Sequence, residues 1–297
     1  RIPEFRVCYV SNKEIKSLSA FTALVEGFKP DIGFFSHIAY DSGHRLPVAE
    51  WMQELKQRRP QACTILDVSQ SLGILAPKFD NADVVFGSCH KWLFGPRGTG
   101  LMWTNENFRD QVGALNWSGE PLSKLSSDIG FAPSGGLDFS IYAGLATCFR
   151  LHRQQGEDKI RERSAGLSLF FRVRLTNLLK SHGIKFRLLE PHDGKLGVNG
   201  MFSLSFQNFD PYPLYDAMNQ QQVHCKCIKD RGRDGQERNL LRFGIPYYET
   251  EARLQKALSV IEDCLRLSLS TSCNRSLRYR MNSEPQATLR AGTQPVL

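Results

Sequence analysis

Residues 83–100 read Asp-Val-Val-Phe-Gly-Ser-Cys-His-Lys-Trp-Leu-Phe-Gly-Pro-Arg-Gly-Thr-Gly, and the rest of the chain is interpreted around them. The apolar run 84–86 predicts a buried strand that ends at Gly87-Ser88. The side chains that follow are therefore presented at the carboxyl edge of a strand. Among them is Lys91, between a histidine and a tryptophan. Desolvation there would lower the pKa of the amine, as attack on a carbonyl requires.

A second strand end lies upstream, where Thr64-Ile65-Leu66 predicts a short buried strand followed by Asp67. Ligands of parallel α/β sheets bind beyond the carboxyl ends of the strands, so Asp67 and Lys91 are expected to face one crevice. For pyridoxal phosphate this pair has a chemical use: a lysine forms the Schiff base, and an aspartate keeps the pyridine nitrogen protonated. The simpler alternatives are a solvated surface lysine and an aspartate that only caps the next helix.

These motifs carry a family resemblance. Asp67-x-x-Gln70, followed by Ser88-x-His90-Lys91 and a Gly-Pro-x-Gly-x-Gly tail, resembles the class V aminotransferase family, which includes cysteine desulfurases, selenocysteine lyases and isopenicillin-N epimerase-like proteins. The resemblance covers residues 30–265. It implies pyridoxal 5'-phosphate bound to Lys91, Asp67 paired with the pyridinium nitrogen, and Gln70 hydrogen-bonded to the phenolic oxygen. It also implies that Ser88 and His90 bind the phosphate.

The same resemblance implies an α/β chain of aminotransferase fold type I. Such a fold has a mostly parallel sheet with helices on both faces, a smaller α+β C-terminal domain and a homodimeric assembly. We expect a cofactor-binding large domain at 1–140, incomplete at its N-terminus because the family's first phosphate-binding turn is missing. Connecting helices at 141–181, a small domain at 182–267 and a disordered tail at 268–297 complete the predicted organisation.

Local patterns predict the individual elements. In the large domain we expect a helix over Ser11–Val25 with a capping box at its start, a helix opened by Pro47, a βαβαβ alternation up to Phe86, and a polar loop over 105–128. Strands are expected at Asp31–Ile38, Leu101–Trp103, Ile184–Leu189, Met201–Phe206, Val223–Ile228 and Leu240–Ile245. Further helices are expected at Ile141–Leu151, Ile160–Leu179, Pro211–Gln220 and Glu249–Leu265.

Composition bounds the class of protein. The chain has 297 residues, 41% of them hydrophobic and 23% charged, which is enough for a two-domain globular core. No apolar segment is long enough to span a bilayer, and the eight cysteines show neither a disulfide framework nor a zinc spacing. We therefore expect a cytoplasmic protein without metal, membrane or nucleic-acid partners. A nucleic-acid role would depend on the net charge of +8 alone.

Substrate recognition is expected at Arg242 and Tyr40. By resemblance, Arg242 stands where family members hold the arginine that binds the α-carboxylate of an amino acid, a task suited to the guanidinium fork. Tyr40 stands where desulfurases place an asparagine. A surface salt-bridging arginine is the alternative at Arg242. At Gly136, relatives carry a threonine that contacts the phosphate of the neighbouring subunit's cofactor.

The reaction type stays open between transamination, epimerisation and C–S lyase chemistry. A desulfurase needs a mobile cysteine, and the candidate is Cys227, which lies in a strand-like alternation together with Cys225. Cys89 is interpreted as a space-filling residue. A catalytically inactive, truncated family member is the remaining alternative.

Overall fold

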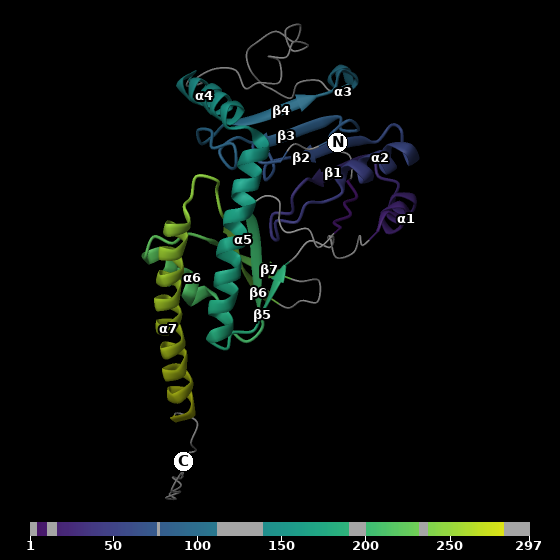
Figure 1. Ribbon diagram of the computed structural model, residues 1–297. Coiled ribbons are helices and arrows are strands. Elements are labelled where there is room, and N and C mark those ends of the chain that lie inside the picture. Colours follow the sequence, from purple (N-terminus) through teal and green to yellow (C-terminus); the bar gives the residue numbers. More distant parts are fainter. Residues whose placement is uncertain are drawn as a thin grey trace, which may run out of the picture.

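The computed structural model describes residues 5–10, 17–75, 78–111, 139–189, 200–231 and 237–281. Two four-stranded sheets organise the chain, with strand orders β1-β2-β3-β4 and β5-β6-β8-β7 (Figure 1). The helices are α1 (Leu18–Phe28), α2 (Val48–Arg58), α3 (Glu106–Gln111), α4 (Phe139–Gln155), α5 (Glu157–Ser181), α6 (Tyr212–Gln220) and α7 (Glu251–Met281). The strands are β1 (Ile32–Ser36), β2 (Cys63–Asp67), β3 (Val84–Ser88), β4 (Gly100–Thr104), β5 (Phe186–Leu189), β6 (Met201–Phe206), β7 (Lys226–Arg231) and β8 (Glu237–Gly244).

The first sheet is mostly parallel, as predicted. Strands β1, β2 and β3 pair in parallel, and β4 joins β3 antiparallel. Helices α1 and α2 cover one face, where Phe21 stacks on Trp51 with ring centroids 5.6 Å apart. On β1, Ile32 and Phe34 alternate with the buried Phe35 and are 55% and 61% exposed. The alternation places them on the face opposite to α1 and α2.

Three local predictions for this part were wrong. Helix α1 begins at Leu18 and not at Ser11, because the backbone of Ser17 is extended and its Oγ accepts a hydrogen bond from the N–H of Ala20 at 3.2 Å. The capping box predicted at Ser11–Glu14 lies outside the described residues. The predicted helix between β2 and β3 is absent from the described residues 68–75 and 78–83, which form turns and irregular structure. The polar loop predicted from residue 105 begins with α3, because the Oδ1 of Asn105 accepts from the N–H of Phe108 at 2.7 Å.

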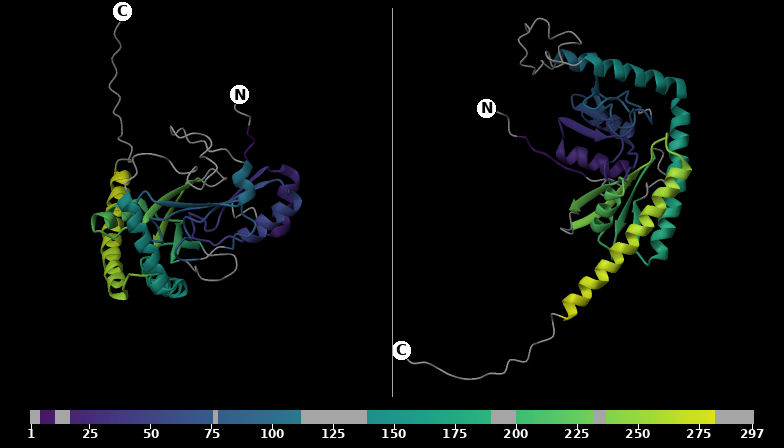
Figure 2. Two further views of the ribbon diagram at one scale, coloured as in Figure 1. Left: turned by 90° about the horizontal axis from the view of Figure 1, so that it is seen from above. Right: turned by 90° about the vertical axis from the view of Figure 1, so that its left-hand side faces the viewer.

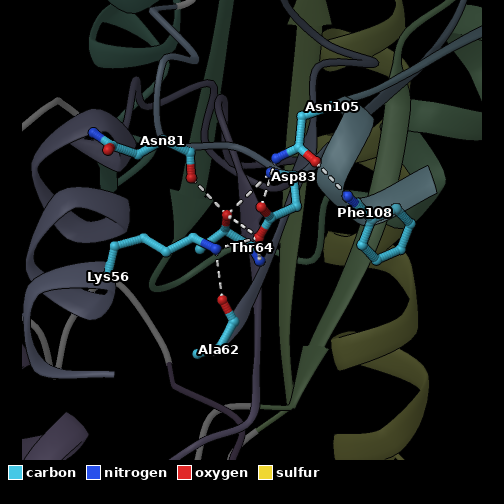
Figure 3. A network of polar contacts seen from close by, with 7 residues as sticks. All are labelled: Lys56, Ala62, Thr64, Asn81, Asp83, Asn105 and Phe108. Carbon is cyan, nitrogen blue, oxygen red and sulfur yellow. Dashed lines mark hydrogen bonds and ion pairs between the residues drawn. The ribbon is translucent and has the colours of Figure 1, made fainter. Parts of the chain in front are cut away.

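A polar network fixes the N-terminal end of this sheet (Figure 3). The carboxylate of Asp83 accepts from the Lys56 ammonium at 2.5 Å, from the Thr64 N–H at 2.7 Å and from the Asn105 amide at 2.7 Å. Burial by itself raises the pKa of Asp83, but these hydrogen bonds outweigh it, so the pKa is lowered overall. These hydrogen bonds connect α2 and β2 to Asp83, which precedes β3, and to Asn105, which follows β4.

The second sheet is antiparallel and carries the predicted α+β arrangement. Helices α5, α6 and α7 pack together over one of its faces, and α5 runs up to the first sheet. Figure 2 shows α5 and α7 beside each other. The core between sheet and helices includes Phe202 and Phe243, whose rings stack with centroids 5.3 Å apart.

Most boundaries in this part differ from the predictions by one to four residues, and two of the differences matter for the argument. Strand β7 begins at Lys226 rather than Val223. Helix α7 continues to Met281, through residues where we predicted disorder. The sequence has no glycine or proline between residue 251 and Pro285, so nothing local ends the helix before that point. Within the described residues, no helix is both long and apolar enough to cross a membrane.

Candidate active site

The carboxyl ends of β1, β2 and β3 meet at one edge of the first sheet. Ser36 lies beside Asp67 in the parallel register, and Asp67 lies beside Phe86. The ladder continues past the strands, because the N–H of His37 donates to the Asp67 carbonyl at 2.9 Å and the N–H of Val68 donates to the Phe86 carbonyl at 2.9 Å. The structure therefore places Asp67 and the residues that follow β3 at the same edge, as the sequence predicted.

Lys91 lies on a tight turn directly after β3. The N–H of Gly95 donates to the Cys89 carbonyl at 2.8 Å, and the N–H of Phe94 donates to the Lys91 carbonyl at 3.2 Å. Leu145 of α4 packs on this turn against Cys89 and Leu93. The turn is therefore fixed both by its own backbone and by a helix packed over it.

A close backbone contact also holds this turn from the side of Gly73. Gly73 has a φ of +92°, and a Cβ at that position would lie 2.7 Å from the Cα of Leu93. Only glycine fits such a position without strain.

The side chain of Lys91 shares its electrostatic environment with Asp67 and Arg242. Burial lowers the pKa of the Lys91 amine, the negative charge of Asp67 opposes this shift, and the positive charge of Arg242 adds to it. The net pKa is below its usual value. The structure thus brings together the amine, the carboxylate and the guanidinium that the sequence assigned to one site.

Asp67 is not the cap of a following helix. Its Oδ1 accepts from the N–H of Ser69 at 2.7 Å in a local turn, and no helix starts in the described residues between β2 and β3. Its Oδ2 has no hydrogen-bond partner within the described part of the chain and so is open to a cationic or N–H partner. Ser69 was missed at the sequence level, although its spacing from Asp67 is typical of an Asx turn.

The same Ser69 holds the end of β3. Its Oγ accepts from the N–H of Ser88 at 3.1 Å and lies 3.4 Å from the Oγ of Ser88. His90 is exposed, next to the half-buried Lys91. Ser88 and His90 therefore lie at the sheet edge with groups able to donate to an anion, which agrees with their predicted place.

Gln70 is 9% exposed and is held by the tryptophan after Lys91. The indole Nε1–H of Trp92 donates to the Gln70 Oε1 at 3.2 Å. An indole N–H can only donate, so the carbonyl oxygen of Gln70 is occupied and its NH₂ group is left as a donor. A donor is the group needed next to a phenolic oxygen, so this geometry fits a pyridoxal cofactor.

Arg242 on β8 reaches across to the loop after β1. Its Nη1 donates to the Tyr40 carbonyl at 2.5 Å, and its Cζ lies 4.2 Å from the centroid of the Tyr40 ring. Burial lowers the pKa of Arg242, and Tyr40 and Asp41 oppose this shift. The surface salt-bridge alternative for Arg242 is not supported, since among the described residues its guanidinium contacts the carbonyl and the ring of Tyr40 and no carboxylate. The Ser203 hydroxyl on β6 also donates a hydrogen bond to the Asp41 carbonyl at 2.5 Å, a contact between the two sheets that the sequence did not predict.

Cys225, directly before β7, and Cys227, on β7, both pack against the core of the second sheet and its helices. In the β7–β8 register Lys226 lies opposite Arg242, whereas Cys227 lies opposite the buried Leu241. Residues paired across strands share a face, so Cys227 faces the helix-covered core. Burial raises the pKa of Cys225 to about 12, with Cys227 adding to it, and burial followed by Asp210 raises the pKa of Cys227.

Two further expectations concern other ligands. Within the described residues no group of three His, Cys, Asp or Glu side chains could hold a metal ion. Gly136 lies outside the described residues.

The site as a whole fits a pyridoxal phosphate molecule. It combines donors at Gln70, Ser88 and His90 with the carboxylate of Asp67 and the desolvated amine of Lys91.

Comparisons with known proteins identify the family and the fold of this chain. Residues 6–256 match the family model Aminotransferase class-V. The isopenicillin N epimerase of Amycolatopsis lactamdurans is 24% identical over 257 residues, which cover 77% of this chain and 59% of that protein. A cysteine desulfurase structure from Thermococcus onnurineus NA1 has a TM-score of 0.68 at 19% identity and covers 86% of this chain and 65% of its own.

A ureidoglycine–glyoxylate aminotransferase structure from Bacillus subtilis has a TM-score of 0.62 at 17% identity and covers 84% of this chain and 64% of its own. At such identities the solved structures show the fold alone. The chain spans less than two thirds of the length of each of these three proteins.

Proposed function

This chain belongs to the aminotransferase class-V family of pyridoxal-phosphate enzymes, and from that premise we propose that the whole protein acts on an amino acid through Lys91. The observation that carries the proposal is the shared environment of Lys91 on the turn after β3, Asp67 at the end of β2 and Arg242 on β8 of the second sheet. We also propose that the first sheet belongs to the cofactor domain and the second to the smaller domain, with α4 and α5 connecting them.

The cofactor, when bound, supplies an electron-withdrawing ring that stabilises negative charge on the carbon next to the substrate amine. Asp67 holds the proton on the ring nitrogen, and Gln70 donates to the phenolic oxygen. Ser88 and His90 donate to the phosphate. Lys91 is the covalent attachment point, and its amine moves a proton at the substrate α-carbon.

Arg242 binds the substrate carboxylate in this proposal. Its stacking on Tyr40 and its bond to the Tyr40 carbonyl hold the guanidinium in place, leaving further N–H groups for two carboxylate oxygens. The reaction is transamination, epimerisation or C–S lyase chemistry, because all three need the amine and the carboxylate anchor but no additional nucleophile.

The desulfurase alternative is disfavoured by Cys227. A persulfide carrier must reach the substrate as a thiolate, yet Cys227 faces the core and its pKa is raised. We therefore propose that Cys225→Ser and Cys227→Ser each leave activity on the true substrate within a few-fold of the parent. A Cys227→Ser variant that keeps its cofactor spectrum but releases no sulfur from cysteine would restore the desulfurase alternative.

The assembly and location of the whole protein are part of the proposal. We propose a cytoplasmic homodimer, in which the cross-subunit phosphate contact is weakened because Gly136 has no hydroxyl. Light scattering on the whole protein, with and without cofactor, would measure the assembly. An active strict monomer would contradict it.

The central experiment is to reduce the cofactor-loaded whole protein with borohydride and to map the labelled peptide. We expect the phosphopyridoxyl group on Lys91. Lys91→Ala should lose both the visible absorbance and the activity, whereas Lys185→Ala, at an exposed position outside the site, should retain both. A label on another lysine would refute the assignment, and a parent protein without visible absorbance would support the inactive-member alternative.

A further inference from the structure

Trp92 follows Lys91 directly, and its ring lies between the two sheets. The side chain is 8% exposed and packs in one cluster with Ile38, after β1, and Met201 of β6. A Cβ at Gly244, the last residue of β8, would lie 3.7 Å from the ring. The indole therefore contacts the edge of the first sheet and the strand that carries Arg242.

The polar end of the same ring points at Gln70. The bond from Nε1 to the Gln70 Oε1 measures 3.2 Å, and both side chains are buried. Because the indole has no acceptor, the Gln70 amide can satisfy it in one orientation only. Rotation of the amide by 180° would put two donors together in a buried place, which is unfavourable.

We propose that Trp92 is a positioning residue, which fixes Gln70 as a hydrogen-bond donor to the phenolic oxygen of pyridoxal phosphate and joins it to the strand of Arg242. This inference rests on the proposed function, because it concerns the same cofactor. Trp92 itself contacts neither substrate nor cofactor in this role. It acts by excluding the second amide orientation of Gln70.

A conservative variant separates the N–H group from the ring. Trp92→Phe keeps an aromatic side chain against Met201 and Gly244 but removes the donor, so Gln70 can turn its oxygen toward the cofactor. We expect about a fivefold to tenfold weaker binding of pyridoxal phosphate to the whole protein, the size of one hydrogen bond. Gln70→Leu should weaken binding to a similar extent.

The titration of the bound cofactor gives a readout that a purely structural role would not move. A hydrogen bond donated to an anionic oxygen stabilises the deprotonated form and lowers its pKa. The pH midpoint of the visible absorbance should therefore rise in Trp92→Phe, by up to about one unit. Trp103→Phe, a matched change at an exposed tryptophan on β4, should titrate like the parent.

A double variant makes the test specific to Gln70. In a Gln70→Leu background, Trp92→Phe should shift the midpoint no further, because there is no amide left to orient. A parent-like midpoint in Trp92→Phe, or an equal added shift in the Gln70→Leu background, would overturn the inference. If borohydride mapping finds no cofactor on Lys91 in the parent, both the proposed function and the inference about Trp92 fail. Cofactor on Lys91 without the predicted shift refutes only the role of Trp92.

Discussion

Arg242 is the residue on which substrate recognition is proposed to depend most. Replacing it with alanine should cost about 2–5 kcal/mol in kcat/KM, because a half-buried cation that pairs with the substrate carboxylate is removed. Steady-state kinetics on an amino-acid substrate measures this loss. Lys229→Ala, at an exposed position on the opposite face of β7, is the matched control and should change kcat/KM little. An Arg242→Ala variant with parent-like KM would show that the carboxylate binds elsewhere.

His37, beside Asp67, predicts a pH dependence of stability. It is 2% exposed, its Nδ1 has no hydrogen-bond partner in the described part of the chain, and burial, with Arg45 adding to it, lowers its pKa to about 4. The pKa of the unfolded state is about 6.5, so the unfolded chain takes up the proton first as pH falls. The stabilisation is complete above about pH 6.5 and declines toward pH 4, by a total on the order of 3 kcal/mol.

Urea denaturation of the parent and of His37→Leu between pH 7 and pH 4 measures this decline. The difference in unfolding free energy between the two proteins should change in that window, in favour of the variant as pH falls. His224→Leu, at an exposed position, should run parallel to the parent. A constant difference between His37→Leu and the parent would contradict the prediction.

At the level of elements, the Asp83 network joins α2 to the strands of the first sheet (Figure 3). Asp83→Ala leaves the Lys56 ammonium and the Thr64 N–H without their acceptor, so we expect a loss of about 2–4 kcal/mol in unfolding free energy. Chemical denaturation with Asp80→Ala as an exposed control measures it. The network lies at the opposite end of the sheet from Lys91, so cofactor absorbance should be unchanged. A stability loss below about 0.5 kcal/mol would show that the network contributes little.

At the level of the whole molecule, the loop after β1 fastens the first sheet to the second. Gly43 has a φ of +77°, and a Cβ there would lie 2.9 Å from the carbonyl oxygen of Met201 on β6. Gly43→Ala should therefore lose about 1–2 kcal/mol of unfolding free energy to the conformational penalty, plus a further amount for displacing β6. It should also raise KM, since β6 pairs with the strand of Arg242.

The matched control for this contact is Gly183→Ala. Gly183 has a similar φ of +69°, but a Cβ there would have no neighbour within 4 Å. It should show the conformational penalty alone and no change in KM. Equal destabilisation of the two variants would mean that the approach of Gly43 to Met201 adds nothing to stability.

The sequence by itself determined the strands of the first sheet and the common edge of Asp67 and Lys91. Apolar runs ending in glycine and polar residues are local signals, and parallel pairing necessarily brings carboxyl ends together. Local signals also explain the errors. The polar composition after residue 105 predicted a loop, but the side chain of Asn105 caps a short helix there. The predicted βαβαβ order required a helix after Asp67, but the side chain of Asp67 stabilises a turn instead.

Only the tertiary structure decided which groups face the site. Tertiary packing brings Trp92 to Gln70 and stacks Arg242 on Tyr40. It also places Cys227 on the core face, away from Arg242. All of these residues are distant from their partners in the chain or lie on different strands. A shift of one residue in the β7–β8 register would have put Cys227 on the face of Arg242 instead. The alternating apolar side chains specify a register only once one face of the sheet is buried by the helices, and that burial joins segments distant in the chain.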